Sequence, residues 1–226
     1  MANRGYGQFC PIAKASEITG ERWTNLVIRE LGAGSNTFND LRKGLPLMSP
    51  SLLSTRLKSL VQSGIVERLE ESVGVRYRLT ESGIELQQVV LQLGIWGQRW
   101  ARSDLSHGDL DPSLLMWDIH RSVDAGYFHK DRTTLMFEFT DYTSKLRRWW
   151  MVVKDKEVDI CLKDPGYKVD LEIVSDVKTL TAYWMGEISM TQALREKRIQ
   201  LSGDSGLKHA IRKWMGRNYF SDVKPG

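Results

Sequence analysis

The stretch from Thr37 to Ser63, TFNDLRKGLPLMSPSLLSTRLKSLVQS, constrains the fold more than any other part of the chain. Thr37 and Asp40 have the spacing of a capping box, which predicts the start of a helix. Ser49 and Pro50 supply the cap and the first residue of a second helix, where a missing N–H costs nothing. The segment between them contains a glycine and a proline, so the stretch predicts two helices joined by a tight turn.

The second of these helices has two unlike faces. Leu53, Leu57 and Leu60 recur at helical spacing and are expected to face a core. The remaining positions carry hydroxyls and basic groups, which suit a DNA major groove because small residues permit close approach and arginine reads guanine. An ordinary helical hairpin with a solvated polar face is the alternative. The residues expected to contact DNA here are Arg42, Ser49, Ser51, Thr55, Arg56 and Lys58, with Arg56 as the main base reader.

A β-hairpin is predicted after the second helix. Residues 65–69 and 75–79 alternate between apolar and polar side chains about a turn at Gly74. Tyr77 and Leu79 are expected to face inward, and Arg76 and Arg78 outward toward DNA. Helix, turn, helix and basic hairpin together predict a winged helix-turn-helix.

Several segments carry a resemblance to a known family: CPIAKASEITGERWTNLVIREL, FNDLRKGLPLMSPSLLSTRLKSLVQSGIVER, YRLTESG and LGIWGQRWA. Together they resemble the HxlR family of bacterial winged-helix transcriptional regulators over about residues 8–102. The resemblance implies double-stranded DNA as a partner. It also implies a homodimer formed by the N-terminal helix and the long helix after the wing. The wing departs from the family in being short and acidic at residues 70–73.

That long helix is predicted from Thr80 to about Arg102. Its apolar residues step by three and four, as at a helix–helix seam. A single wing domain has too little core to cover them, so a second subunit is the expected cover. Packing on the second domain of the same chain is the alternative. The residues expected at the dimer interface are Leu86, Val90, Leu93, Trp96 and Trp100.

Cys10 precedes Pro11 and is predicted to cap the first helix. The helix dipole and the ammonium of Lys14, one turn on, would favour its thiolate. The HxlR resemblance implies a cysteine that, in some relatives, senses oxidants or electrophiles. The alternative is a small, partly buried residue at a dimer contact.

The chain of 226 residues is too long for one winged helix and fits two domains. We expect a DNA-binding and dimerisation domain at 1–103, a polar linker at 104–111 and a second domain at 112–226. In that second part strands are predicted first and helices later, which is typical of an α+β layer domain. The expected strands are 133–139, 147–153, 157–162, 170–174 and 198–202.

The sequence DPGYKVDLEIVSDVKTLTAYWMGEISMTQALREKRIQLSGDSGL is similar to the C-terminal part of sterol-carrier-protein type lipid-binding domains. That resemblance implies a five-stranded sheet covered by helices around an apolar cavity. Large, soft Trp and Met side chains suit such a cavity, although they equally fill an ordinary core. The residues expected to contact a hydrophobic effector are Trp149, Trp184, Met185 and Trp214.

Catalytic and metal-binding patterns are missing from the sequence. It contains no G-x-S-x-G elbow, no phosphate-binding glycine loop and no histidine cluster, and its two cysteines lie far apart. We therefore expect no enzyme activity, no cofactor and no metal. No apolar run approaches the ~20 residues that cross a membrane, so a cytoplasmic protein without a membrane partner is expected. The net charge is +4, and residues 36–60 contain four basic residues and one acidic residue.

Three functions follow from these patterns. The first is a homodimeric transcriptional regulator whose second domain binds a hydrophobic effector. The second is a regulator that switches at Cys10, with a purely structural second domain. The third is a lipid carrier in which the wing serves as a protein-interaction module.

Overall fold

The computed structural model describes residues 5–101, 109–143, 145–224 and 226 of the chain. The chain divides into two compact units, Met1–Gly97 and Gln98–Gly226. Most of the linker expected at 104–111 lies outside the described residues.

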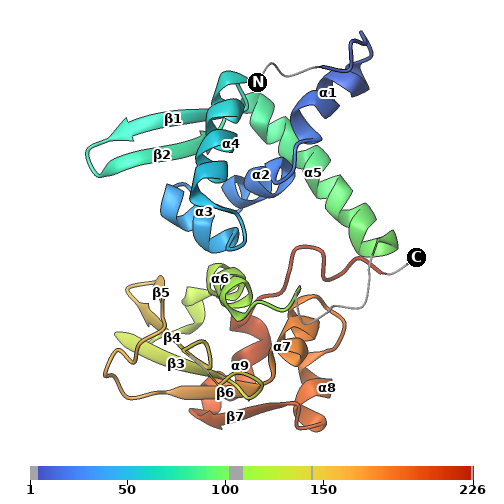
Figure 1. Cartoon of the computed structure of the whole chain (residues 1–226). Helices are drawn as coiled ribbons and strands as arrows, with labels where there is room; N and C mark the ends of the chain where they lie inside the picture. Colours follow the sequence, from blue (N-terminus) through green and yellow to red (C-terminus); the bar gives the residue numbers. More distant parts are fainter. Residues whose placement is uncertain (1–4, 102–108, 144, 225) are drawn as a thin grey trace. The chain divides into compact units, whose positions relative to one another are not determined.

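The first unit combines helices with a two-stranded hairpin (Figure 1). This order is that of the winged helix-turn-helix predicted from the sequence. Its elements are α1 (Pro11–Thr19), α2 (Thr24–Gly32), α3 (Phe38–Gly44), α4 (Pro50–Gln62), β1 (Val66–Glu71), β2 (Gly74–Leu79) and α5 (Glu81–Trp100), of which the last three residues fall in the second unit.

Side-chain caps set the starts of the two central helices. The Thr37 hydroxyl accepts the Asp40 N–H at 3.1 Å, and the Ser49 hydroxyl accepts the Leu52 N–H at 3.3 Å. Each cap satisfies one of the donors that a helix leaves unpaired in its first turn. Both predicted caps are therefore confirmed.

The start of α2 is set by the backbone of Trp23. Its φ of 77° lies in the left-handed region, so the helix begins at Thr24. Leu26, in its first turn, is 41% exposed. The buried side of α2 instead carries Val27, Ile28 and Leu31, which join the core formed with α3, α4 and the hairpin.

The hairpin is antiparallel and has the predicted turn. Its register runs from Val66 opposite Leu79 to Glu71 opposite Gly74. The N–H of Tyr77 also donates to the carbonyl of Asn36 at 2.8 Å, which fixes β2 to the segment before α3. In Figure 1 the hairpin extends away from the helices of this unit.

The second unit is an α+β domain built on one sheet. The sheet order is β5-β4-β3-β6-β7, in which β3 and β6 are parallel and the other neighbours are antiparallel. All five predicted strands are present within one or two residues of their expected ends. The elements are α6 (Pro112–Ser122), a 3₁₀ turn at Ala125–Tyr127, β3 (Arg132–Phe139), β4 (Arg148–Lys154), β5 (Glu157–Cys161), β6 (Leu171–Ser175), α7 (Val177–Trp184), α8 (Met190–Arg195), β7 (Ile199–Gly203) and α9 (Ser205–Trp214).

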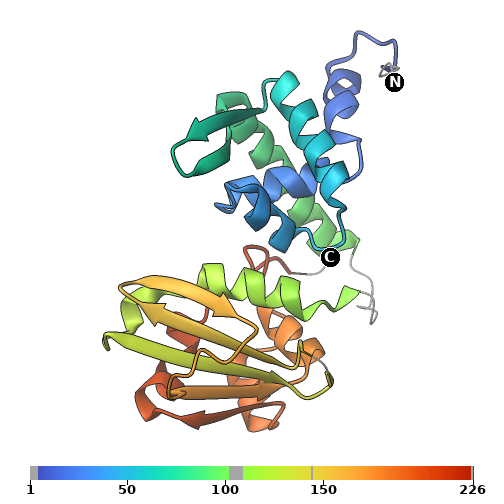
Figure 2. The same ribbon diagram turned by 60° about the vertical axis from the view of Figure 1, so that its left-hand side comes forward.

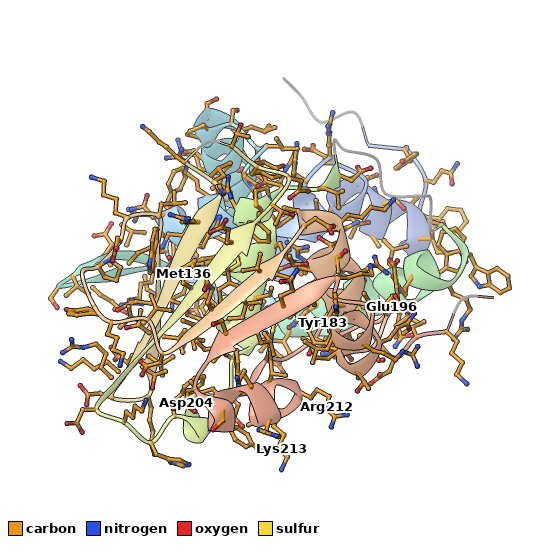
Figure 3. All side chains as sticks on the ribbon, turned by 90° about the horizontal axis from the view of Figure 1, so that it is seen from below. Met136, Tyr183, Glu196, Asp204, Arg212 and Lys213 are labelled. Atoms are coloured by element: carbon orange, nitrogen blue, oxygen red, sulfur yellow. The ribbon has the colours of Figure 1, made fainter. Side chains whose placement is uncertain are left out.

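One face of this sheet forms a core with the helices. Phe137, Met151 and Ile173 belong to the same buried cluster as residues of α6, α7 and α9, among them Trp214. In Figure 2 the strands β3, β4 and β5 lie side by side, with α6 beside them. Figure 3 labels Asp204, which caps α9, and the exposed Lys213 near its end. The arrangement accounts for the alternating burial along β4 and β6.

Candidate nucleic-acid interface

The candidate interface is the exposed side of α4 and the residues next to it. Leu53, Leu57 and Leu60 are at most 2% exposed and hold the helix against the core. Because their stripe fixes the rotation of α4, its other side faces solvent. The exposed residues of the predicted set are Arg42, Ser49, Ser51, Thr55 and Lys58.

The hydroxyls on this side are already oriented. Thr55 donates its hydroxyl hydrogen to the carbonyl of Ser51 at 3.0 Å. Its oxygen therefore presents lone pairs outward, as an acceptor for a base amino group. The Ser49 and Ser51 hydroxyl oxygens lie 3.2 Å apart, so one donates to the other.

Two cations beside these hydroxyls are available for phosphates. Neither Lys58 nor Arg42 forms an ion pair with any residue that the structure describes. Lys43, by contrast, lies 3.3 Å from the carboxylate of Asp40. An unpaired exposed cation can contact phosphate without first giving up a protein partner.

Arg56 was placed wrongly by the sequence interpretation. It was expected on the exposed side as the main base reader, but it is only 8% exposed and its Nη1 pairs with the carboxylate of Glu21. Burial lowers the pKa of its guanidinium from the ordinary value. Arg56 follows Leu53 by three positions and precedes Leu57, so it belongs to the buried stripe of α4. That periodicity was the signal in the sequence that could have placed it.

The arginines of the wing are engaged within the first unit. Arg76 contacts Glu71 at 2.7 Å and donates to the side chain of Asn36 at 2.8 Å. Arg78 contacts Glu67 at 2.6 Å while remaining exposed. The two side chains were expected to be free for DNA, so a DNA contact from either must compete with these carboxylates.

The apolar stripe expected on α5 divides into two sides. Leu86 and Val90, also expected at the dimer interface, are partly buried and pack against the core of the first unit. Leu93, Trp96 and Trp100 are 53%, 57% and 61% exposed. This second side continues to Val89, which is 62% exposed.

Cys10 is a half-buried free thiol at the start of α1. The ammonium of Lys14, expected to favour its thiolate, lies 3.0 Å from the carboxylate of Glu17. That hydrogen bond is the largest cause of the lowered pKa of Glu17. Lys14 therefore has an acidic partner on its own helix.

The four residues expected to contact an effector lie in or against the core of the second unit. Trp149, Trp184 and Trp214 are at most 7% exposed, and Met185 packs against the same cluster. The indole N–H of Trp214 donates to the carbonyl of Leu207 at 3.0 Å. All four therefore lie in or against the packed core of this unit, and their contact with an effector stays a prediction.

Among the described residues, no group of three or more His, Cys, Asp or Glu side chains is arranged to hold a metal ion. No helix in this part of the chain has the length and apolar character needed to cross a membrane.

Comparisons with known proteins concern the first unit. A family model described as HxlR-like helix-turn-helix matches residues 18–105. The HTH-type transcriptional regulator YvaP of Bacillus subtilis (strain 168) is 33% identical over 112 residues, which are 48% of this chain and 95% of YvaP. The HTH-type transcriptional regulator YodB of the same organism is 37% identical over 95 residues, which are 40% of this chain and 85% of YodB.

Solved structures give the same kind of match. The reduced form of YodB from B. subtilis is 34% identical, covers 43% of this chain and 100% of that chain, and has a TM-score of 0.38. The redox regulator HypR in its oxidized form is 30% identical, covers 42% of this chain and 100% of that chain, and has a TM-score of 0.39.

Replacing Arg56 with alanine is expected to lower the free energy of unfolding by about 1–3 kcal/mol, because it removes a buried stem and leaves Glu21 without its partner. Urea denaturation of the whole protein measures this. Lys58→Ala is the matched control on the same helix, and its exposed position predicts a change within about 0.5 kcal/mol. Unchanged stability of Arg56→Ala together with lost DNA binding would return Arg56 to the interface.

Proposed function

Because the chain belongs to the HxlR-like helix-turn-helix family of transcriptional regulators, we propose that its first unit binds operator DNA through the exposed side of α4. The observation that carries this proposal is one helix face with acceptor hydroxyls at Ser51 and Thr55 and the unpaired cation Lys58. We propose that the hydroxyls approach base edges in the major groove while Lys58 and Arg42 contact phosphates.

We expect the wing to contribute less to DNA affinity than α4 does. Its arginines are held by Glu71 and Glu67, and breaking a salt bridge offsets part of what a phosphate contact contributes. Arg78 is the better candidate of the two because it is the more exposed. We therefore expect most of the affinity to come from α4 and the end of α3.

Lys58→Ala is expected to weaken binding to all duplexes alike and to reduce the slope of log affinity against log salt by about 0.9, the value for one lost phosphate contact. Fluorescence anisotropy over a salt series measures this, on a duplex selected from a random library and on an unrelated duplex. Lys213→Ala, an equal loss of charge on α9 of the second unit, is the control and should leave the slope unchanged.

Thr55→Ala makes the complementary change. It is expected to reduce the preference for the selected duplex while leaving the salt slope intact, because it removes an acceptor and no charge. Binding of both Lys58→Ala and Thr55→Ala with wild-type affinity, salt slope and preference would contradict the assignment to α4.

We further propose that the chain acts as a homodimer through the exposed side of α5. Val89, Leu93, Trp96 and Trp100 follow one another at helical spacing and expose large apolar side chains. Such a patch favours association, and two-fold symmetry would match two operator half-sites. The proposed interface excludes Leu86 and Val90, which pack against the core of the first unit.

Leu93→Asp is expected to shift the protein from dimer to monomer, because it places an unpaired charge in the apolar contact. Sedimentation velocity at micromolar concentration measures the shift. Gln88→Asp, on an exposed position of the same helix that is three or four residues from none of the interface residues, adds the same charge outside the proposed interface and should stay dimeric. A dimeric Leu93→Asp would move the interface elsewhere.

A second candidate function is thiol-based regulation at Cys10. It is favoured by the position of this free, half-buried thiol at the first turn of α1 and by the HxlR resemblance. We expect a thiol oxidant to lower operator affinity at least tenfold in the wild type and not in Cys10→Ser. Cys161→Ser is the matched control and should respond as the wild type does. An equal response in all three proteins would remove Cys10 as the switch.

For the second unit we retain the proposal of a sterol-carrier-like domain that binds a hydrophobic effector. Its support is the five-stranded sheet packed with helices, which is the architecture that the resemblance implies. Entry of a ligand would have to displace Trp184 or Trp214 from the core. Native mass spectrometry of the purified protein tests this: a retained apolar molecule supports the proposal, and Trp184 and Trp214 fluorescence insensitive to added fatty acid contradicts it.

A further inference from the structure

A cavity of about 360 Å³, partly open to solvent, lies in the first unit between α1, the turn before α2, and α4. It is on the side of α4 that faces away from the proposed DNA contacts. Such a volume is at the lower end of the range for small-molecule pockets, about 300–1,000 Å³. The residues of its wall that matter here are Lys14, Ile18, Glu21, Thr24, Arg56 and Leu60.

Two residues of this wall each have a polar atom that is buried without a hydrogen-bond partner in the described part of the chain. They are the hydroxyl oxygen of Thr24 and Nε of Arg56, whose residues are 1% and 8% exposed. Buried polar atoms are normally paired, because leaving one unpaired costs free energy. Both residues line one cavity, so a group that replaces Glu21 there could accept from Arg56 and bond to Thr24.

Glu21, the partner of Arg56, does not bond all the N–H groups of its guanidinium. Glu21 pairs with Nη1 and leaves Nε unbonded. A carboxylate that is free of the chain can take two guanidinium N–H groups at once, which is the stronger and more specific geometry. The Glu21 side chain is 44% exposed, so it can move into solvent when it is replaced.

The turn that carries Glu21 is strained. Trp23, two residues later, has a φ of 77°, which an L side chain adopts at a cost. Conformations of this kind cluster at ligand clamps and switch regions. The cavity, the unpaired atoms and the strained turn therefore coincide at the point where α4 is fastened to the start of α2.

We propose that this cavity binds a small organic acid whose carboxylate replaces that of Glu21 on Arg56. Its carboxylate accepts from Nε of Arg56 and from the Thr24 hydroxyl, and a short apolar body lies against Ile18 and Leu60. Lys14 supplies a second positive charge at the wall, although it is shared with Glu17 at 3.0 Å. The site does not depend on the proposed DNA contacts, and the test contains no DNA.

Benzoate is a suitable probe, with benzamide as a neutral control of the same shape. In ¹H–¹⁵N spectra of the full chain, we expect benzoate to shift the amides of Thr24 and Leu60 and the Nε–H signal of Arg56 in a saturable way. Benzamide should leave them in place at equal concentration. The absence of a saturable shift at about 10 mM benzoate, ten times a weak ligand's ~1 mM Kd, would overturn the proposal.

Two variants test the exchange itself. Glu21→Gln removes the competing carboxylate and keeps a side chain of equal size, so it is expected to bind benzoate about tenfold tighter. Thr24→Val removes the hydroxyl at constant shape and should bind more weakly than the wild type. The unliganded spectrum of each variant establishes that it is folded. Wild-type affinity in folded Glu21→Gln would rule out replacement of Glu21 by the ligand.

Discussion

The rotation of α4 about its axis is the constraint on which the first unit depends. A helix of 13 residues has one face to bury, and Leu53, Leu57 and Leu60 occupy it together with Arg56. The polar side of the candidate interface follows from this rotation, since the hydroxyls and the unpaired lysine lie at the positions of α4 that are not buried. The same buried face contains the salt bridge to Glu21, so the outward surface and the inward cavity belong to one helix.

Much of this arrangement could be predicted because it depends on residues close to one another in the sequence. The Thr37 and Ser49 caps, the hairpin about Gly74 and the five strands of the second unit all depend on neighbouring residues. Arg56 could not be placed by residue type alone, because charge suggested exposure while its spacing put it on the buried stripe. Its partner Glu21 is distant in sequence, and such a pairing is set by tertiary packing.

Tertiary packing also sets other side-chain environments that the sequence did not predict. Leu86 and Val90 belong to an apolar stripe too wide for one contact, and the sequence does not say which edge the wing domain covers. A tryptophan looks the same in the sequence whether it fills an interior or lines a pocket, and Trp149, Trp184 and Trp214 belong to the packed cluster of the second unit. Trp23 has a left-handed backbone conformation although it is neither glycine nor asparagine, so its residue type does not signal that conformation. Pattern therefore identified the elements, while the neighbours of individual side chains required the three-dimensional structure.

The pairing of β3 with β6 has a consequence for synthesis of the chain. Strands β3, β4 and β5 follow one another as an antiparallel meander and can form as soon as they leave the ribosome. The other edge of β3, which is among the most buried strands, waits for β6 and then for β7. During that interval the nascent chain presents an apolar strand edge, a template for pairing with another chain. Slow translation between residues 162 and 203 would lengthen this exposure, so aggregation during expression should depend on elongation rate there.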